Sequence, residues 1–566
     1  MAKLARVAVW FDTEEAGKRW NYGVNVFEKF VGEILAQRSV PFQWIDGTLE
    51  QDLASFDLVI AALTNEREET QATLLRYMEN GGTIVSYGGL NGLAKAMKCR
   101  LLPYPDIGYA ELSSSFTSLR ELRYLTCRPW IQDSTEGAGI AADGLLSASG
   151  ETQAASRVPA LLSIPVGSGF LERWAVNIPQ TVVRLQQGSR PVFEDGVPAP
   201  DGTAELQEGI LKPDDQCEMD WERDRLVTKA GTPYFAFPYA DYWKEVLIGH
   251  LVKVCAAKNR TLPVADLLPD GTEAVALVSH DSDMNDNDSA RTTLEQLVLN
   301  GIRSSWCILQ PGFEPGIYEL VKEQRHDLGL HFNALRKQGG EWSQGAFDRQ
   351  CAWLKEAAGI DTIPFNKNHY TCFEGWDELF DWCERNGIAL DQTRGPSKTG
   401  NVGFPFGTCT PYYPISSFLQ KNRSFRVLEL GFLTQDMGLE GWGDVTAIRP
   451  LLEKVKEVRG IAHFLFHQIH IHTDPKVREG LKQVAEEARS LGFEFWTTSQ
   501  MLKWEADRRA IRWEETEDGS ANPSWDGEET LVVYLPLADS EYAGEEETVH
   551  RFGHPCIRRT ISRVTV

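Results

Sequence analysis

The sequence predicts an α/β protein in three parts: a doubly wound N-terminal domain, a distorted (β/α) barrel of seven or eight units, and a small C-terminal β appendage. Strand patterns alternate with helical patterns before residue 110 and again after residue 270, which is typical of parallel sheets. The stretch between these regions differs, because it holds short β-like runs and loops rich in Pro and Gly. A chain of 566 residues is also too long for one ordinary core.

The N-terminal half contains buried-strand patterns separated by helical apolar spacing. The second helix is followed by Gly81-Gly82, a natural helix C-cap. We place this domain at residues 1–258, with a β-rich insertion at 110–235. The expected strands are 5–11, 58–63, 83–87, 173–178 and 181–185, and the expected helices are 27–37, 70–80 and 240–257.

The second region of alternating patterns predicts the barrel, which we place at residues 270–508. The chain then becomes acidic and β-like, so residues 509–566 are expected to form the appendage. The expected barrel strands are 274–279, 304–309, 328–331, 362–366, 388–391, 426–430, 461–467 and 493–497. The expected barrel helices are 290–300, 315–325, 343–358, 375–386, 445–458 and 475–491.

Composition excludes several classes of partner. The chain has 57 Lys and Arg against 81 Asp and Glu, a formal charge of −24, which disfavours nucleic acid and anionic membranes. No apolar run is long enough to span a membrane, and the N-terminus lacks the features of a signal peptide, so we expect a cytoplasmic protein. The ten cysteines form no CxxC pair and are expected to be reduced and buried.

Asp and His residues stand where four expected barrel strands end, and barrel active sites form at those ends. Asp281 and Asp283 follow the first strand, and two such close carboxylates suit a cation ligand beside a proton acceptor. His331, His369 and His467 end or follow three others, and imidazole is the commonest transition-metal ligand.

Each of these motifs alone has an ordinary interpretation, such as a helix-capping loop or a structural histidine. Together, at one barrel mouth, they predict the site of a metal-dependent hydrolase. Two further histidines, His470 and His472, lie beyond the last of these strands and are expected on a surface loop.

These motifs resemble the polysaccharide deacetylase superfamily over residues 272–508. The segment Ser279-His280-Asp281-Ser282-Asp283 resembles its first motif in a divergent Thr-His-Asp-Val-Asp form. The other matching segments are Gly329-Leu330-His331, Asn368-His369-Tyr370, 387–393, 404–411, Phe464-Leu465-Phe466-His467 and 497–504.

The resemblance implies that Asp281 is the general base, Asp283 and His331 are metal ligands, and His467 is the general acid. The family's second metal-binding His corresponds to Leu335 here, so the third ligand must come from elsewhere, and we expect His369.

Further roles follow from the same resemblance. Lys367 or Arg394 could replace the family's Arg beside the base, and Asp391 could orient His467. The residues expected to contact substrate are Tyr370, Arg394, Trp306 and Asn333.

The implied chemistry is hydrolysis of an N- or O-linked acetyl group on a carbohydrate, with a divalent metal, expected to be zinc. One alternative is a glycoside hydrolase, in which Asp281 pairs with Glu429 or Asp436. Another is a carbohydrate-binding protein with a degenerate site, which Leu335 favours.

The N-terminal half resembles the glutamine-amidotransferase-like fold. That family carries its nucleophile Cys on a tight turn after a strand, and the corresponding turn here, residues 86–92, has no Cys. We therefore expect a non-catalytic domain that serves homo-oligomer assembly or substrate contact. Gly88-Gly89 could instead cradle an anion at a helix start.

Overall fold

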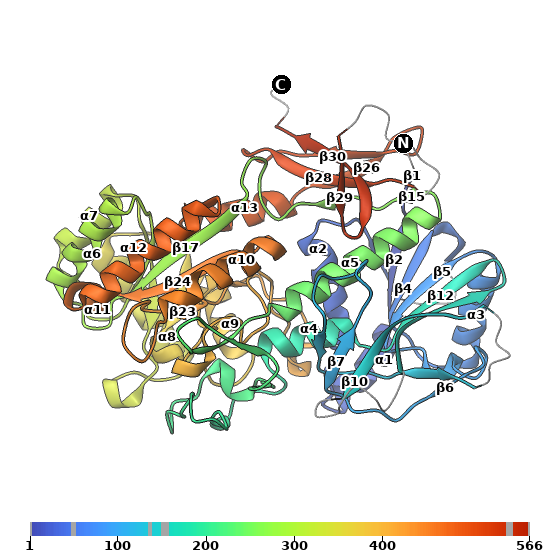
Figure 1. The fold of residues 1–566 in the computed structure, drawn as a ribbon, viewed down its shortest axis with the longest axis horizontal. Coiled ribbons are helices and arrows are strands. Elements are labelled where there is room, and N and C mark those ends of the chain that lie inside the picture. Colours follow the sequence, from blue (N-terminus) through green and yellow to red (C-terminus); the bar gives the residue numbers. More distant parts are fainter. Residues whose placement is uncertain (1–2, 47–52, 134–138, 149–157, 539–546, 564–566) are drawn as a thin grey trace.

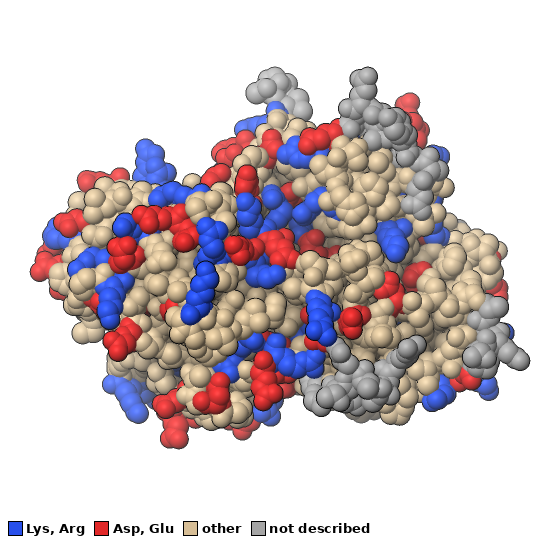
Figure 2. Space-filling view, viewed as in Figure 1, with Lys and Arg blue, Asp and Glu red and all other residues tan. Residues whose placement is uncertain are grey.

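The computed structural model describes residues 3–46, 53–133, 139–148, 158–538 and 547–563. Two large sheets lie side by side, and the C-terminal strands lie against both halves (Figure 1). Within the described ranges, no helix combines the length and the apolar character that crossing a membrane requires. Acidic and basic side chains are interspersed over the face drawn in Figure 2.

The N-terminal sheet has nine strands among the described residues, in the order β3-β2-β4-β5-β12-β11-β10-β7-β8. Its first five strands are parallel, as predicted, and the insertion extends the same sheet with antiparallel strands. The parallel strands are β3 (Gln43–Ile45), β2 (Val7–Phe11), β4 (Leu58–Leu63), β5 (Thr83–Tyr87) and β12 (Gly169–Trp174). The antiparallel strands are β11 (Val158–Val166), β10 (Ala141–Ala148), β7 (Gly108–Glu111) and β8 (Leu122–Tyr124).

The predicted strand at 181–185 is wrong, because these residues lie within the helix α4 (Ile178–Gln187). Their β-branched side chains suggested a strand. Asn177 caps the helix by accepting a hydrogen bond from the Gln180 backbone N–H, and Pro179 occupies the first turn, so capping outweighs β propensity here. The strand predicted at 173–178 is displaced, because β12 ends at Trp174. The other helices of this half are α1 (Thr13–Asn21), α2 (Val31–Gln37), α3 (Glu68–Glu79) and α5 (Tyr239–Ala257).

The C-terminal half is built on a curled parallel sheet in the order β22-β21-β20-β19-β18-β17-β24-β23. β17 (Ala274–Asp281) is buried along its whole length and pairs with β24 (Ile461–His467), so the first strand lies beside one of the last. β22 and β23 stand at the two ends of this order and do not pair with each other, so the sheet does not close into a complete barrel. The remaining strands are β18 (Ser305–Ile308), β19 (Asp327–Phe332), β20 (Phe365–Asn368), β21 (Leu390–Asp391), β22 (Leu428–Glu429), β23 (Thr434–Gln435) and β25 (Phe493–Trp496).

Helices surround this sheet close to the predicted positions. They are α6 (Asn287–Leu299), α7 (Pro315–Glu323), α8 (Gln344–Ala358), α9 (Glu378–Asn386), α10 (Ile448–Val458), α11 (Gln468–Thr473), α12 (Pro475–Ser490) and α13 (Thr498–Arg509). At the end of the chain, a hairpin is formed by β26 (Arg512–Glu515) and β27 (Ala521–Ser524). A separate sheet has the order β16 (Val264–Ala265), β28 (Leu531–Pro536), β30 (His554–Ile561) and β29 (Thr548–Arg551).

The two halves are tied together by buried polar contacts. Asn422, which is fully buried, accepts hydrogen bonds from the Trp20 indole N–H at 2.8 Å and the Val26 backbone N–H at 2.7 Å. On α2, the Gln37 side-chain amide donates to the Pro411 carbonyl at 2.7 Å.

A segment of the N-terminal half, residues 189–221, also lies against the loops at the carboxyl ends of β20 and β21. We call it the covering segment. Val192 bridges to Gly375, and the Phe373 backbone N–H donates to the Leu211 carbonyl at 2.9 Å. The mouth of the barrel is therefore built partly from the first half of the chain.

Candidate active site

Three predicted metal ligands converge at the carboxyl ends of three strands of the curled sheet, β17, β19 and β20. Asp283 follows β17, His331 lies in β19, and His369 follows β20. The Asp283 Oδ1 atom lies 3.1 Å from His331 Nε2 and 3.3 Å from His369 Nδ1, and these two nitrogens lie 3.2 Å apart. We call this group the Asp283 cluster.

Hydrogen bonds on the far side of each ring fix which nitrogen faces the cluster. His331 Nδ1 donates to the Lys367 carbonyl at 2.9 Å, and His369 Nε2 donates to Gln338 Oε1 at 2.8 Å. The lone pairs of His331 Nε2 and His369 Nδ1 are therefore directed at the Asp283 carboxylate. Burial lowers the pKa of His369, which favours the neutral form that binds a metal.

The cluster fits a divalent ion such as zinc. Zinc bonds of about 2.0–2.1 Å in a tetrahedron place ligand atoms about 3.3 Å apart. Burial acts to raise the pKa of Asp283, but contacts with His331 and His369 and the charge of His467 hold that pKa well below its usual range. The carboxylate is therefore anionic, as a ligand must be.

Asp281 lies beside the cluster and is held by a lysine. Its Oδ1 accepts a hydrogen bond from Lys367 Nζ at 3.1 Å, and Lys367 also donates to Ser279 Oγ at 2.6 Å. The other oxygen, Oδ2, lies 3.8 Å from His331 Nε2. Burial acts to raise the pKa of Asp281, but Lys367 and the histidines lower it overall, so the group is a carboxylate.

His467 faces the same cluster from the end of β24. Its Nε2 lies 3.7 Å from Asp283 Oδ2, and its Nδ1 donates to Asp436 Oδ2 at 2.6 Å. Burial acts to lower the pKa of His467, but Asp436, followed by Asp283 and Asp281, raises it to about 10. The imidazole is therefore protonated at neutral pH.

The prediction that Asp391 orients His467 is wrong, because Asp436 occupies that position. Asp391 instead accepts hydrogen bonds from the Asn366 side chain at 2.8 Å and from Thr393. The sheet order explains the difference: β21, which carries Asp391, is separated from β24 by four strands, whereas β23, which precedes Asp436, is next to β24.

Two predicted substrate contacts are enclosed in the protein. Trp306 is 0% exposed and donates its indole N–H to Ser304 Oγ at 3.1 Å. Arg394 is 2% exposed and pairs with Glu429 at 3.1 Å. Neither side chain presents a surface to a substrate, and Lys367, rather than Arg394, is the cation beside Asp281.

The other two predicted contacts lie near the cluster. Tyr370 is 44% exposed, with its ring centre 4.7 Å from that of His369. Asn333 shapes the loop after β19, because it donates to the Gln338 carbonyl at 3.1 Å and accepts from the Leu335 backbone N–H.

Sequence reasoning did not identify Gln338, and it named Asp436 only as an alternative carboxylate. Gln338 lies in a loop with no motif of its own, and its position beside His369 depends on the folded loop. Asp436 follows the two-residue strand β23, which apolar patterning did not reveal. The weak signal for Asp436 was its place in the chain, ahead of the β24 strand that ends in His467.

The two carboxylates that could pair with Asp281 in a glycoside hydrolase are buried and bonded to other side chains. Glu429 is 1% exposed against Arg394, and burial together with Asp391 raises its pKa well above the usual range. Asp436 is buried under His467 and His470.

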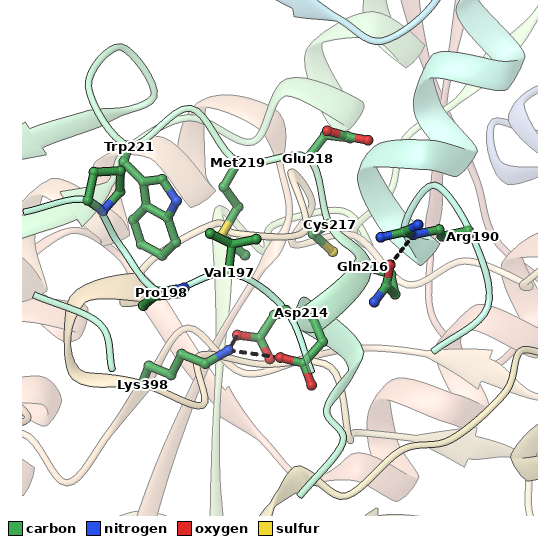
Figure 3. Close-up of a pocket in the computed structure, with 13 residues that line it drawn as sticks. Arg190, Val197, Pro198, Asp214, Gln216, Cys217, Glu218, Met219, Trp221 and Lys398 are labelled. Carbon is green, nitrogen blue, oxygen red and sulfur yellow. Dashed lines mark hydrogen bonds and ion pairs between the residues drawn. The ribbon is translucent and has the colours of Figure 1, made fainter. Parts of the chain in front are cut away.

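Two hollows lie near this end of the barrel. One, of about 420 Å³, is lined by polar groups of the loop after β19 and of α8, among them Arg336, Gly340 and Gln350. Another, of about 340 Å³, lies in the covering segment, where Trp221 and Met219 face an ion pair between Asp214 and Lys398 (Figure 3). Neither hollow is lined by the Asp283 cluster, and we place the site at the cluster because the reactive groups converge there.

No protein-family model and no curated protein matches the chain. Among solved structures, a candidate polysaccharide deacetylase from Mycobacterium smegmatis overlaps 42% of this chain and 91% of its own, at 13% identity and a TM-score of 0.32. The Xyl-CE4 domain of a multidomain xylanase from the hindgut metagenome of Trinervitermes trinervoides overlaps 42% and 92%, at 11% identity and a TM-score of 0.24.

A cold-adapted β-galactosidase from Rahnella sp. R3 overlaps 30% of this chain at 20% identity and a TM-score of 0.24. The chain spans 28% of the length of that β-galactosidase. Overlaps at these scores assign no family, so the functional assignment depends on the site itself.

Proposed function

We propose that this chain is a metal-dependent hydrolase that removes acetyl groups from a carbohydrate. The observation that carries the proposal is the Asp283 cluster. Three acceptor atoms lie 3.1–3.3 Å apart while the ring protons of both histidines are directed at other oxygens. Such a convergence of lone pairs and negative charge is stabilised by a cation.

The residues around the cluster supply a general base and a general acid for acyl hydrolysis. Asp281 accepts the proton of the attacking water at Oδ2, because Oδ1 is held by Lys367. His467 donates a proton from Nε2 to the leaving amine or alkoxide, and Asp436 holds its ring in place through Nδ1. When bound, a divalent ion at Asp283, His331 and His369 polarises the acyl oxygen and lowers the pKa of water.

The groups available favour acyl transfer over glycoside cleavage. A glycoside hydrolase needs two carboxyl groups flanking the bond, separated by about 5–10 Å. Asp281 has an imidazolium acid, His467, as its partner, whereas Glu429 is enclosed with Arg394. An acid, a base and a metal site together suit hydrolysis of an amide or an ester.

A sugar substrate is favoured by the groups at the rim. Tyr370 offers an exposed ring beside His369, and aromatic rings stack on the apolar faces of sugars. The polar hollow next to the loop of Gln338 provides hydrogen-bonding groups for hydroxyls.

The proposal is tested by acetate release from N-acetylhexosamine oligomers and acetylated small glycosides. We expect acetate from at least one substrate, loss of activity in chelator, and recovery on addition of one equivalent of zinc. The Asp281→Asn variant serves as the matched inactive control. Undiminished activity in chelator would contradict the metal dependence, and release of free sugar without acetate would show a glycoside hydrolase instead.

A further inference from the structure

A second group of potential metal ligands lies next to the Asp283 cluster. His470, in α11, follows His467 by three residues, and its Nδ1 lies 2.9 Å from Asp436 Oδ2. His467 Nδ1 lies 2.6 Å from the same oxygen. The ligand atoms of Asp436, His467 and His470 all lie within 4.8 Å of one another, and we call this group the Asp436 cluster.

The Asp436 cluster has the chemistry and support of a zinc site. Two imidazole nitrogens and a carboxylate oxygen leave a fourth position free for water. The second oxygen of Asp436 is fixed by the His467 backbone N–H at 2.7 Å. The far nitrogen of His467, Nε2, lies 3.7 Å from Asp283 Oδ2 and is directed away from the Asp436 cluster.

The cluster is also accessible. The side chain of His470 is 35% exposed, whereas Asp436 is buried, so one ligand lies at the surface and the anionic ligand beneath it. One ligand of the cluster is therefore in contact with solvent.

We infer that Asp436, His467 and His470 form a second, weaker zinc site whose occupation inhibits the hydrolase. The inhibitory part rests on the proposed function. Zinc bound at His467 Nδ1 displaces the proton that this nitrogen donates to Asp436, and that proton passes to solvent. The ring is then neutral, and its Nε2–H is a far poorer acid than an imidazolium. Zinc at the Asp436 cluster would therefore remove the proton donor while leaving the Asp283 cluster intact.

Zinc stoichiometry tests the site without any assay of activity. The full chain, purified without a polyhistidine tag and freed of metal, is titrated with Zn²⁺ by calorimetry and by equilibrium dialysis. We expect two equivalents for the native sequence and one for His470→Gln. His331→Gln should lose the tighter equivalent and keep the weaker one.

His472→Gln is the matched control, because His472 lies in the same helix and contacts Thr292 Oγ1 at 2.8 Å instead of the cluster. It should keep both equivalents. Thermal unfolding of each variant shows that the fold is retained. One equivalent in the native chain, or two in a folded His470→Gln variant, would overturn the second site.

Acetate release tests the inhibition. The rate of the native chain with the second site filled should be roughly 10²–10⁴-fold below its rate with one equivalent of zinc, the range that a general acid contributes. The ratio of the two rates should be close to one in His470→Gln. An equal fall in both proteins would overturn the inhibitory role. If no acetylated sugar is hydrolysed at all, the proposed function fails, and the stoichiometry still decides whether the second site exists.

Discussion

The ring nitrogens His331 Nε2 and His369 Nδ1 lie 3.2 Å apart, and the opposite nitrogen of each ring donates to an oxygen of the protein. Each imidazole is thereby held in the tautomer that directs a lone pair at Asp283. Hydrogen bonds of this kind orient metal-binding histidines and tune their basicity.

Replacing Gln338 by Leu should weaken zinc binding at the Asp283 cluster by roughly 10–100-fold, the usual cost of losing support behind a metal-binding histidine. Without the Gln338 oxygen, His369 is free to turn and to change tautomer. Competition with a chromophoric chelator measures the affinity. Gln338→Glu keeps an acceptor at the same place and should retain the native affinity. Equal affinities in the Leu variant and the native chain would contradict the role.

Substitutions of Asp281, at the end of β17, and of Asp283, just after it, should have different effects. Asp281→Asn should keep one tight zinc per chain, while its rate falls by roughly 10²–10⁴, because only the proton acceptor is lost. Asp283→Asn should lose the tight zinc as well as rate, because a charged ligand becomes neutral. Elemental analysis alongside acetate release separates the two outcomes. Equal loss of zinc in both variants would refute the division of roles.

Asp436→Asn should shift the alkaline limb of the pH–rate profile to lower pH. His467 must be protonated to act as the acid, so activity is lost as the pH rises through its pKa, which Asp436 raises to about 10. Removing the negative charge lowers that pKa, and the limb follows it. The tight zinc equivalent should remain, which separates loss of the orienting carboxylate from loss of the metal. An unmoved limb would contradict the assignment of His467.

Lys367→Met should destabilise the fold by about 3–5 kcal/mol, the usual cost of leaving a buried charge without its partner. Lys367 is fully buried, and its partner Asp281 is buried beside it. Urea denaturation in chelator measures the free energy of unfolding. In the Asp281→Asn background the same substitution should cost less, because the neutral amide leaves no uncompensated charge. An equal cost in both backgrounds would show that packing, and not charge, holds Lys367 there.

Much of the barrel and of the Asp283 cluster could be predicted from the sequence, because the carboxyl ends of parallel strands all lie at one edge of the sheet. An apolar run that ends in Asp or His marks both the strand and the edge at which its polar end lies, as β17, β19 and β24 show. Once β19 and β20 are taken as neighbours, His369 is the natural partner of His331.

The remaining assignments depend on contacts that periodicity does not encode. Trp306 lies in β18 and Arg394 follows β21, but the side chains of both are buried in the protein. Asp436 reaches His467 because a two-residue strand lies next to β24, and the apolar signal of two residues is too short to detect. The antiparallel strands that extend the N-terminal sheet also depend on pairings between segments distant in the chain.

The buried Asn422 indicates that the second half of the chain depends on the first half for its folding. It belongs to the second half, yet its carboxamide oxygen satisfies the N–H groups of Trp20 and Val26 in the first. A gene fragment that encodes only residues 270–508 would leave this amide, and the loops under the covering segment, in contact with water. We expect such a fragment to be insoluble by itself and to be rescued by co-expression of the preceding residues as a separate polypeptide. Because residues 1–258 are synthesised first, we expect them to be available for these contacts while residues 270–508 fold.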